Sequence, residues 1–122
     1  FALKPEEHTM ATPEIYWTGA SQTKYGYWSH PLPFSCNPGQ DGNYIFTKIV
    51  NNVWVPIYIG QGDLNERVND PTHYGCATRK GATHVHVHTN AKEQDRLNEE
   101  SDLLAGHPNA YAPTGCNQKA GG

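Results

Sequence analysis

The sequence has no long apolar run, no C-x-x-C pair and no excess of positive charge. Without about 20 consecutive apolar residues it offers no candidate membrane span, and it has no charged-then-apolar signal segment. We therefore expect a cytoplasmic protein that has no membrane partner. The net charge of −3 does not indicate a generic nucleic-acid binder, so any contact with phosphate would come from a local patch.

Cysteine is scarce, and its pattern indicates no cross-linked framework. The three cysteines are Cys36, Cys76 and Cys116. An odd number of cysteines without close pairs is typical of neither a disulfide scaffold nor a zinc ribbon. We expect three reduced thiols, as in a cytosolic protein.

The length of 122 residues allows one domain with a single core. Residues 1–41 contain five prolines, which exclude a long helix there, so we predict an irregular N-terminal arm. Its aromatic side chains, Trp28 among them, could stack on nucleobases, although packing of the arm onto a small sheet is the simpler interpretation. Residues 118–122 are expected to form a flexible tail, which leaves 42–117 as the main folded unit.

Residues 42–60 have the pattern of two β-strands joined by a tight turn. A three-residue loop at 50–52 would pair Tyr44 directly with Tyr58 and place both phenols on one face of the sheet. A two-residue turn would shift the register by one and separate the phenols, unless a bulge restored it. Pro56 cannot donate a ladder hydrogen bond, so we expect the second strand at a sheet edge and the first strand in the centre.

A short helix is predicted directly after the second strand. Asp63 and Glu66 form a capping-box pattern, and the helix over 64–69 would end before Pro71. Arg67 lies beside the core-facing stripe of this helix, so its guanidinium can reach back over the sheet. The alternative is an arginine whose stem merely covers apolar surface.

A longer helix is predicted over 91–105, and Gly106 can terminate it. Within this helix, Glu100 follows Leu97 by three residues and precedes Leu104 by four, which places a carboxylate in the core-facing stripe. A buried carboxylate is costly unless it is paired or binds a cation. We therefore expect Glu100 to point inward and to be functional.

The segment between these helices is rich in polar residues and histidine. Residues 70–82 are predicted to form a polar loop in which Arg79 and Lys80 could contact phosphate. Residues 83–89 alternate strictly, which predicts a strand with three histidines on one face. The histidines are His84, His86 and His88. Neighbouring ones could share a metal ion, but no further ligand lies near them in sequence to complete a tetrahedral set.

The order of these features resembles the GIY-YIG endonuclease superfamily. Matching residues occur in the family's order at Gly42 and Tyr44, at 58–60, and at Arg67, Glu100 and Asn117. The resemblance covers residues 42–117. Two departures stand out: Asn43 replaces the isoleucine of the first motif, and Pro71 lies where several relatives have a histidine or tyrosine after the arginine. His73 is the candidate substitute for that accessory base.

The resemblance implies an α+β fold with a small three-stranded antiparallel sheet and flanking helices. It also implies a metal-dependent DNA endonuclease that hydrolyses phosphodiester bonds. Glu100 would bind Mg²⁺ or Mn²⁺, and Arg67 would clamp the scissile phosphate. Tyr44 would take a proton from the attacking water with the help of Tyr58, and Asn117 would fix the geometry of the site.

Two other functions are compatible with the sequence. One is a non-catalytic DNA-binding or accessory module that keeps the same fold. The other is a small metal-binding protein that uses its three alternating histidines. Activity on DNA and metal content of the purified protein would discriminate between these functions.

Overall fold

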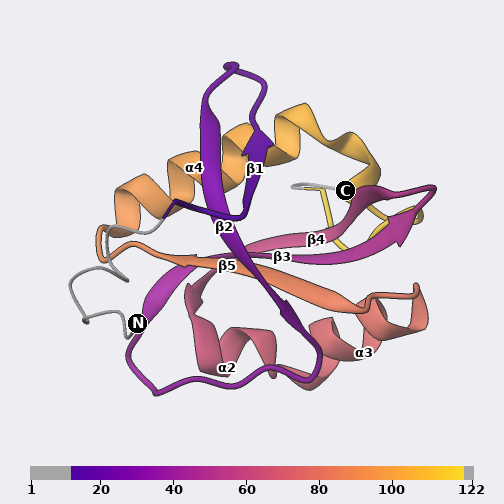
Figure 1. Cartoon of the computed structure of the whole chain (residues 1–122), viewed down its shortest axis with the longest axis horizontal. Helices are drawn as coiled ribbons and strands as arrows, with labels where there is room; N and C mark the ends of the chain where they lie inside the picture. The colour runs from indigo at the N-terminus through magenta and orange to yellow at the C-terminus, as the bar shows by residue number, and fades with distance from the viewer. Residues whose placement is uncertain (1–11, 120–122) are drawn as a thin grey trace, which may run out of the picture.

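The computed structural model describes residues 12–119, which form a five-stranded antiparallel sheet with helices on both faces (Figure 1). The strands are β1 (Ile15–Thr18), β2 (Lys24–Pro31), β3 (Asp41–Val50), β4 (Val53–Asp63) and β5 (His84–Thr89). The helices are α2 (Leu64–Val68), α3 (Pro71–Arg79) and α4 (Glu93–Gly106), followed by the 3-10 turn η1 (Pro108–Ala110). Residues 1–11 and 120–122 lie outside this description, and with them the start of the predicted arm and most of the predicted flexible tail.

The prediction of a three-stranded sheet is wrong, because the sheet has five strands in the order β1-β2-β5-β3-β4. The expected positions of two strands are confirmed: β3 is central and β4 is at the edge. The predicted irregular arm instead supplies β1 and β2, and β2 joins the sheet by pairing with β5. The tyrosines and tryptophans of this region favour strands. Pro31 does not prevent pairing because it lies at the end of β2.

The turn between β3 and β4 has two residues rather than the expected three. Val50 pairs with Val53, and both residues between them have positive φ, 51° at Asn51 and 64° at Asn52. Two left-handed residues make a turn whose twist matches that of the flanking strands, and asparagine tolerates this conformation. Taken alone, this turn would place the two tyrosines on opposite faces.

A β-bulge restores the shared face. The register between β3 and β4 shifts between Phe46 and Thr47, which leaves Ile57 on β4 without a partner. One extra residue reverses the alternation of the strand beyond it. As a result, Tyr44 and Tyr58 lie on the same face with ring centroids 6.0 Å apart. They are diagonal neighbours and not the directly opposed pair that was predicted.

Each face of the sheet has its own apolar core. Figure 1 shows the helices that cover these cores, α4 on one side and α2 and α3 on the other. The core under α2 and α3 includes Tyr44, Phe46, Leu64, Val68, Ala77 and Val85. The core under α4 includes Trp17, Tyr27, Ile45, Ile59 and Leu103. The candidate tyrosines therefore belong to the face covered by α2 and α3.

The segment predicted as a polar loop over 70–82 contains a helix, α3. Asp70 is its N-cap and accepts hydrogen bonds from the backbone N–H groups of Thr72 and His73. Pro71 occupies the first turn, where the missing N–H has no cost. The prediction of a loop is wrong because a polar segment can still form a helix when it begins with an N-cap residue followed by proline, as Asp70 and Pro71 do here.

The predicted inward face of α4 is wrong by one residue. Arg96, Glu99 and Leu103 are buried, whereas Leu97 is 37% exposed. Glu100 is half-buried at the border of the buried face. The rotation of this helix about its axis is therefore determined by the buried polar residues Arg96 and Glu99 as well as by its leucines. No helix within residues 12–119 is long and apolar enough to cross a membrane.

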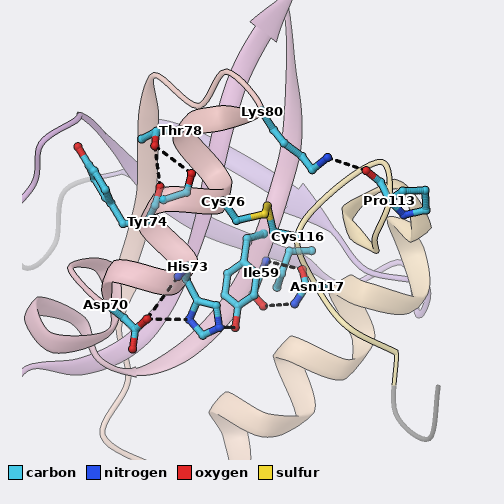
Figure 2. The surroundings of a disulfide bond; sticks show 12 residues. Ile59, Asp70, His73, Tyr74, Cys76, Thr78, Lys80, Pro113, Cys116 and Asn117 are labelled. Atoms are coloured by element: carbon cyan, nitrogen blue, oxygen red, sulfur yellow. Dashed lines mark hydrogen bonds and ion pairs between the residues drawn. A yellow bond between two sulfur atoms is a disulfide. The ribbon is translucent and has the colours of Figure 1, made fainter.

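A disulfide joins α3 to the segment after η1, so the expectation of three reduced thiols is wrong for Cys76 and Cys116. Figure 2 shows this bond between α3 and the C-terminal segment 111–119, called the tail below, next to Asn117. The backbone N–H of Cys116 also donates to the carbonyl of Ile57, the bulged residue of β4, at 2.8 Å. The bond therefore fastens α3 and the tail to the edge of the sheet.

Replacing both Cys76 and Cys116 by serine is expected to reduce the free energy of unfolding. The cysteines are separated by 40 residues, and closing a loop of that size in the unfolded chain gives about 4 kcal/mol. Urea unfolding of the oxidised protein and the double variant measures the difference. Cys36→Ser is the matched control, because Cys36 is the free cysteine within the described residues. Equal stability of all three proteins would contradict the cross-link.

Candidate active site

Gly60 provides the space in which the Tyr44 phenol lies across the edge strand. Tyr44 is only 1% exposed and pairs with Gly60 in the β3–β4 ladder. A Cβ atom on Gly60 would lie 2.6 Å from both Cζ and Oη of Tyr44. The ring therefore covers bare backbone, which only glycine allows at this distance. This arrangement carries the hydroxyl from the centre of the sheet to its β4 edge.

Tyr58 is linked to a histidine and a carboxylate on α3. The rings of Tyr58 and His73 stack with centroids 4.5 Å apart, and His73 Nε2 lies 3.4 Å from the Tyr58 hydroxyl. Asp70 Oδ1 lies 3.9 Å from His73 Nδ1, a buried atom that has no hydrogen-bond partner within residues 12–119. Tyr58, His73 and Asp70 therefore form a row that leads away from Tyr44. His73 reaches the site from a helix and not from the predicted loop.

Arg67 folds back over the edge strand, as expected from its place on α2. A Cβ atom on Gly62 would lie 2.9 Å from Arg67 Nε and 3.0 Å from its Cγ. Gly62 and Gly60 are two residues apart on β4 and share a face. The arginine stem and the Tyr44 ring therefore use the two glycines of one strand. The Arg67 side chain as a whole is exposed, so its guanidinium is available to a ligand.

Glu100 lies on α4, which packs against β4 from the other side of the sheet. Burial raises the pKa of the Glu100 carboxyl, and the positive charge of Arg67 counteracts this effect. Burial also raises the pKa of Tyr58, and the Glu100 charge adds to that rise. Coulomb effects of this kind decay with distance. Tyr44, Tyr58 and Arg67 therefore meet at the β4 edge, and the charge of Glu100, the fourth group that the sequence singled out, acts on them there.

The Tyr44 hydroxyl is protonated at neutral pH in this environment. Burial raises the pKa of Tyr44 well above its usual range, and the neighbouring Tyr58 adds to the rise. Arg67 acts in the opposite direction, but burial outweighs it. Arg67 alone therefore does not turn Tyr44 into a phenolate, and proton removal from Tyr44 would need a further positive charge.

Asn117 holds the edge strand between the two motif residues. Its Oδ1 accepts from the backbone N–H of Ile59 at 2.8 Å, and its Nδ2 donates to the Ile59 carbonyl at 2.9 Å. Figure 2 shows this pair of bonds beside the disulfide. The side chain thus acts like one residue of an added strand. This geometry agrees with a positioning role for Asn117.

The two candidate phosphate contacts on α3 are not part of this convergence. Lys80 Nζ donates to the carbonyl of Pro113 at 2.7 Å, which fixes it on the tail (Figure 2). Arg79 is exposed, and its Nη1 would lie 3.2 Å from a Cβ atom on Gly75. Contact of Arg79 or Lys80 with nucleic acid therefore stays a prediction.

The three histidines of β5 each form a hydrogen bond with a different side chain. His86 is fully buried, and its Nδ1 accepts from Trp17 Nε1 at 2.9 Å. His88 Nε2 lies 2.6 Å from Glu99 Oε2, and the His84 ring packs on Trp54. Within residues 12–119, no three His, Cys, Asp or Glu side chains are grouped to hold a metal ion.

Burial of His86 is expected to make stability depend on pH. Burial lowers the pKa of His86 from 6.5 to about 4, and the charges of His84 and His30 add to the effect. The unfolded chain therefore takes up this proton first as the pH falls. Stability is complete above pH 6.5 and declines towards pH 4, by about 3 kcal/mol for this group. Urea unfolding between pH 7.5 and 4.5 measures the decline, and His86→Gln should flatten it. An unchanged slope in that variant would contradict the assignment.

Sequence reasoning missed the carboxylate next to Glu100. The Glu99 side chain is buried and accepts a hydrogen bond from the Tyr27 hydroxyl, in addition to its contact with His88. These contacts fix the rotation of α4 and so direct Glu100 towards the β4 edge. The only sequence signal was a histidine-bearing strand that needed a polar partner, and it does not identify which glutamate supplies one.

No protein-family model, curated protein or solved structure matches the chain.

Proposed function

We propose that this chain is a metal-dependent DNA endonuclease of the GIY-YIG type that hydrolyses phosphodiester bonds. The observation that supports the proposal is the meeting of two phenols and a guanidinium at one strand edge, where the charge of the Glu100 carboxylate also acts. Phosphodiester cleavage needs positive groups where charge develops on the phosphoryl oxygens and a group that accepts a proton from water. The site contains side chains of each kind.

The residues at the site fit a hard divalent cation. The Glu100 carboxylate is half-buried, and none of the three ion pairs formed within residues 12–119 includes it. Mg²⁺ and Mn²⁺ prefer oxygen ligands, and Mg²⁺ commonly binds through one or two carboxylates together with water and phosphate. Glu100 would hold such an ion, which when bound would stabilise charge on the phosphoryl group and offset the cost of the buried carboxylate.

Arg67 is proposed to bind and orient the scissile phosphate. The Arg67 side chain is exposed as a whole, while its Cγ and Nε lie against Gly62. A planar guanidinium can donate two parallel hydrogen bonds to phosphate oxygens. The contact with Gly62 limits the freedom of the stem, so less entropy is lost when the phosphate binds.

Tyr58 and His73 are proposed to accept the proton of the attacking water. Tyr58 is less buried than Tyr44, and its hydroxyl faces His73 Nε2. As Tyr58 takes a proton from water, it can pass its own proton to the neutral imidazole, and Asp70 would stabilise the imidazolium that results. Tyr44 keeps its proton and orients the water by hydrogen bonding. This division replaces the sequence-based role of Tyr44 as base, because burial disfavours the Tyr44 phenolate.

Cleavage assays with and without metal test the proposal. The full chain is expected to nick or cut DNA in Mg²⁺ or Mn²⁺ and to lose all cleavage in EDTA. Binding to the same DNA is measured in parallel by fluorescence anisotropy. Cleavage that persists in EDTA would refute a metal-dependent mechanism. DNA binding without cleavage under any metal condition would instead identify a non-catalytic module with this fold.

The sequence predicted a cytoplasmic protein, whereas the Cys76–Cys116 disulfide is more typical of an oxidising compartment. Reducing compartments keep most cysteines as thiols. Alkylation of the protein in intact cells followed by mass spectrometry separates the two situations. Modified Cys76 and Cys116 would support a cytoplasmic protein, and protected ones would place it in an oxidising compartment.

A further inference from the structure

A cleft of about 800 Å³ lies on the same face of the sheet as Tyr44. Trp28 and His30 of β2 and Phe34 of the following segment contribute aromatic rings to its wall. Leu64 of α2 and Val87 of β5 also line it. Figure 1 shows the chain between β2 and β3 passing close to α2, and Phe34, Ser35 and Cys36 of this segment line the cleft. The strand β2 was not expected from the sequence, and without it the cleft would not exist.

The cleft adjoins the candidate active site. Val87, which lines the cleft, pairs with Tyr44 across β5 and β3. Paired residues in antiparallel strands have Cα atoms about 5 Å apart. Leu64, on the other wall, is one helical turn before Arg67 on α2. A DNA strand whose phosphate contacts Arg67 could therefore place an adjacent nucleotide in the cleft.

The lining is suited to a flat, uncharged ring. Among residues 12–119, no Asp, Glu, Lys or Arg lines the cleft, so no permanently charged side chain there favours a charged ligand. Trp28 is half-buried, which leaves part of its indole open, and the His30 and Phe34 rings pack 5.1 Å apart. Ser35, Gln40 and Thr89 add polar groups that can donate and accept hydrogen bonds. Aromatic walls with a few polar groups are typical of sites for heteroaromatic ligands.

We propose that this cleft binds an unpaired nucleobase of the DNA strand that is cut at the neighbouring site. This inference rests on the proposed nuclease function and specifies its substrate. A base inside a duplex cannot enter a cleft of this kind, because its faces are covered by stacking and its edge is paired. The protein should therefore prefer single-stranded DNA, or DNA with an unpaired or easily extruded base, over a regular duplex.

Anisotropy measurements in EDTA test the cleft without interference from cleavage. A fluorescein-labelled single strand and a duplex of the same sequence are titrated with the full chain. Trp28→Ala is expected to weaken single-strand binding on the order of tenfold, the effect of losing one stacked base, and to leave duplex binding unchanged. Trp28→Phe should retain most of the affinity. Tyr16→Ala is the matched control, because Tyr16 is a 52% exposed aromatic outside the cleft.

Two further measurements test the cleft independently of the stability of Trp28→Ala. Abasic substitution at one position of the single strand should reduce affinity for the wild type but not for Trp28→Ala. If Trp28→Ala lowers the melting temperature, Gln40→Ala takes its place, because Gln40 is an exposed residue of the cleft, and it should weaken single-strand binding several-fold.

The cleft proposal would be overturned if Trp28→Ala and Tyr16→Ala bound the single strand equally well, or if abasic DNA bound like intact DNA. Free thymidine that binds more tightly than the oligonucleotide would show that the site takes nucleosides and not DNA. Unchanged cleavage and unchanged DNA binding in Trp28→Ala would refute the base site but not the nuclease function. Trp28-dependent DNA binding without cleavage in Mg²⁺ would refute the nuclease function but not the base site.

Discussion

Glu100→Gln is expected to slow DNA cleavage about 10³-fold while leaving the protein at least as stable as the wild type. The amide has the size of the carboxylate but cannot carry its negative charge, so it binds a divalent cation poorly. The loss of metal-assisted charge stabilisation amounts to several kcal/mol, which corresponds to a rate reduction of about 10³-fold. Single-turnover cleavage of labelled DNA in saturating Mg²⁺ measures this change.

The stability of the same variant provides the discriminating part of this prediction. Burial raises the pKa of the Glu100 carboxyl, so the folded protein holds the charged form less favourably than the unfolded chain does at neutral pH. The Glu100 contribution to stability therefore increases as the pH falls through the raised pKa and is lost as the pH rises. Glu100→Gln removes this cost, and its melting temperature at pH 7.5 should match or exceed that of the wild type.

Glu93→Gln is the matched control, because Glu93 is an exposed glutamate on the same helix. It should cleave DNA at the wild-type rate and melt a little below the wild-type temperature, because Glu93 lies in the first turn of α4, where a negative charge is slightly stabilising. A Glu100→Gln variant that is less stable and equally active would assign Glu100 a structural role. Lost activity with unchanged or raised stability is instead the pattern of a residue kept for function.

Local signals were sufficient for the parts of the site that depend on neighbours in the chain. Asp63 caps α2 by accepting from the backbone N–H of Glu66 at 3.0 Å, as its capping pattern predicted. Pro56 correctly indicated the edge strand, because a missing N–H constrains pairing whatever the rest of the fold does. The direction of the Arg67 side chain could be predicted from its position on α2, because this position lies beside the core-facing stripe of the helix.

Features that depend on distant partners could not be predicted from the sequence. The pairing of Cys76 with Cys116 spans 40 residues, and spacing alone does not indicate which cysteines meet. The strand β2 exists because β5 offers it an edge, so the prolines around it gave the wrong prediction. The rotation of α4 is set by the contacts of Glu99 with Tyr27 and His88, and a count of leucines along the helix misses it.

The prediction that Tyr44 and Tyr58 share a face of the sheet is correct, although the predicted loop length and the predicted direct pairing of the two tyrosines are both wrong. The predicted odd-length loop is replaced by a two-residue turn and one extra residue on β4. A three-residue loop, or a two-residue turn plus one bulged residue, inserts the same number of unpaired residues between the two strands. Tyr44 and Tyr58 therefore point to the same face of the sheet in either arrangement. The bulge also leaves the Ile57 carbonyl free to accept from the backbone of Cys116. The irregular edge thus helps to anchor the tail that carries Asn117.

Gly60→Ala is expected to reduce cleavage about 100-fold, because a displacement of about 1 Å in a catalytic group has an effect of that size. The added methyl group would meet Tyr44 Cζ and Oη at 2.6 Å, closer than side-chain atoms can approach. The Tyr44 ring is 1% exposed and packed against Phe46 and Tyr58, so it has no free space into which to move. Its hydroxyl, or the edge strand itself, must shift. Single-turnover cleavage with saturating DNA measures the loss, which should fall on the rate of the chemical step and leave DNA binding within a few-fold.

The matched control for this substitution is Gly75→Ala. Gly75 lies in α3, where alanine favours the helix, and the nearest atom to its added methyl group is Arg79 Nη1 at 3.2 Å. That atom is the end of an exposed, flexible side chain, so it can move aside and cleavage should be unchanged. Gly60→Ala removes no polar group and introduces no charge, so a selective loss of the chemical step would be due to displacement of the Tyr44 hydroxyl. Full activity in Gly60→Ala would show that the position of this hydroxyl is not critical, and would remove Tyr44 from the proposed site.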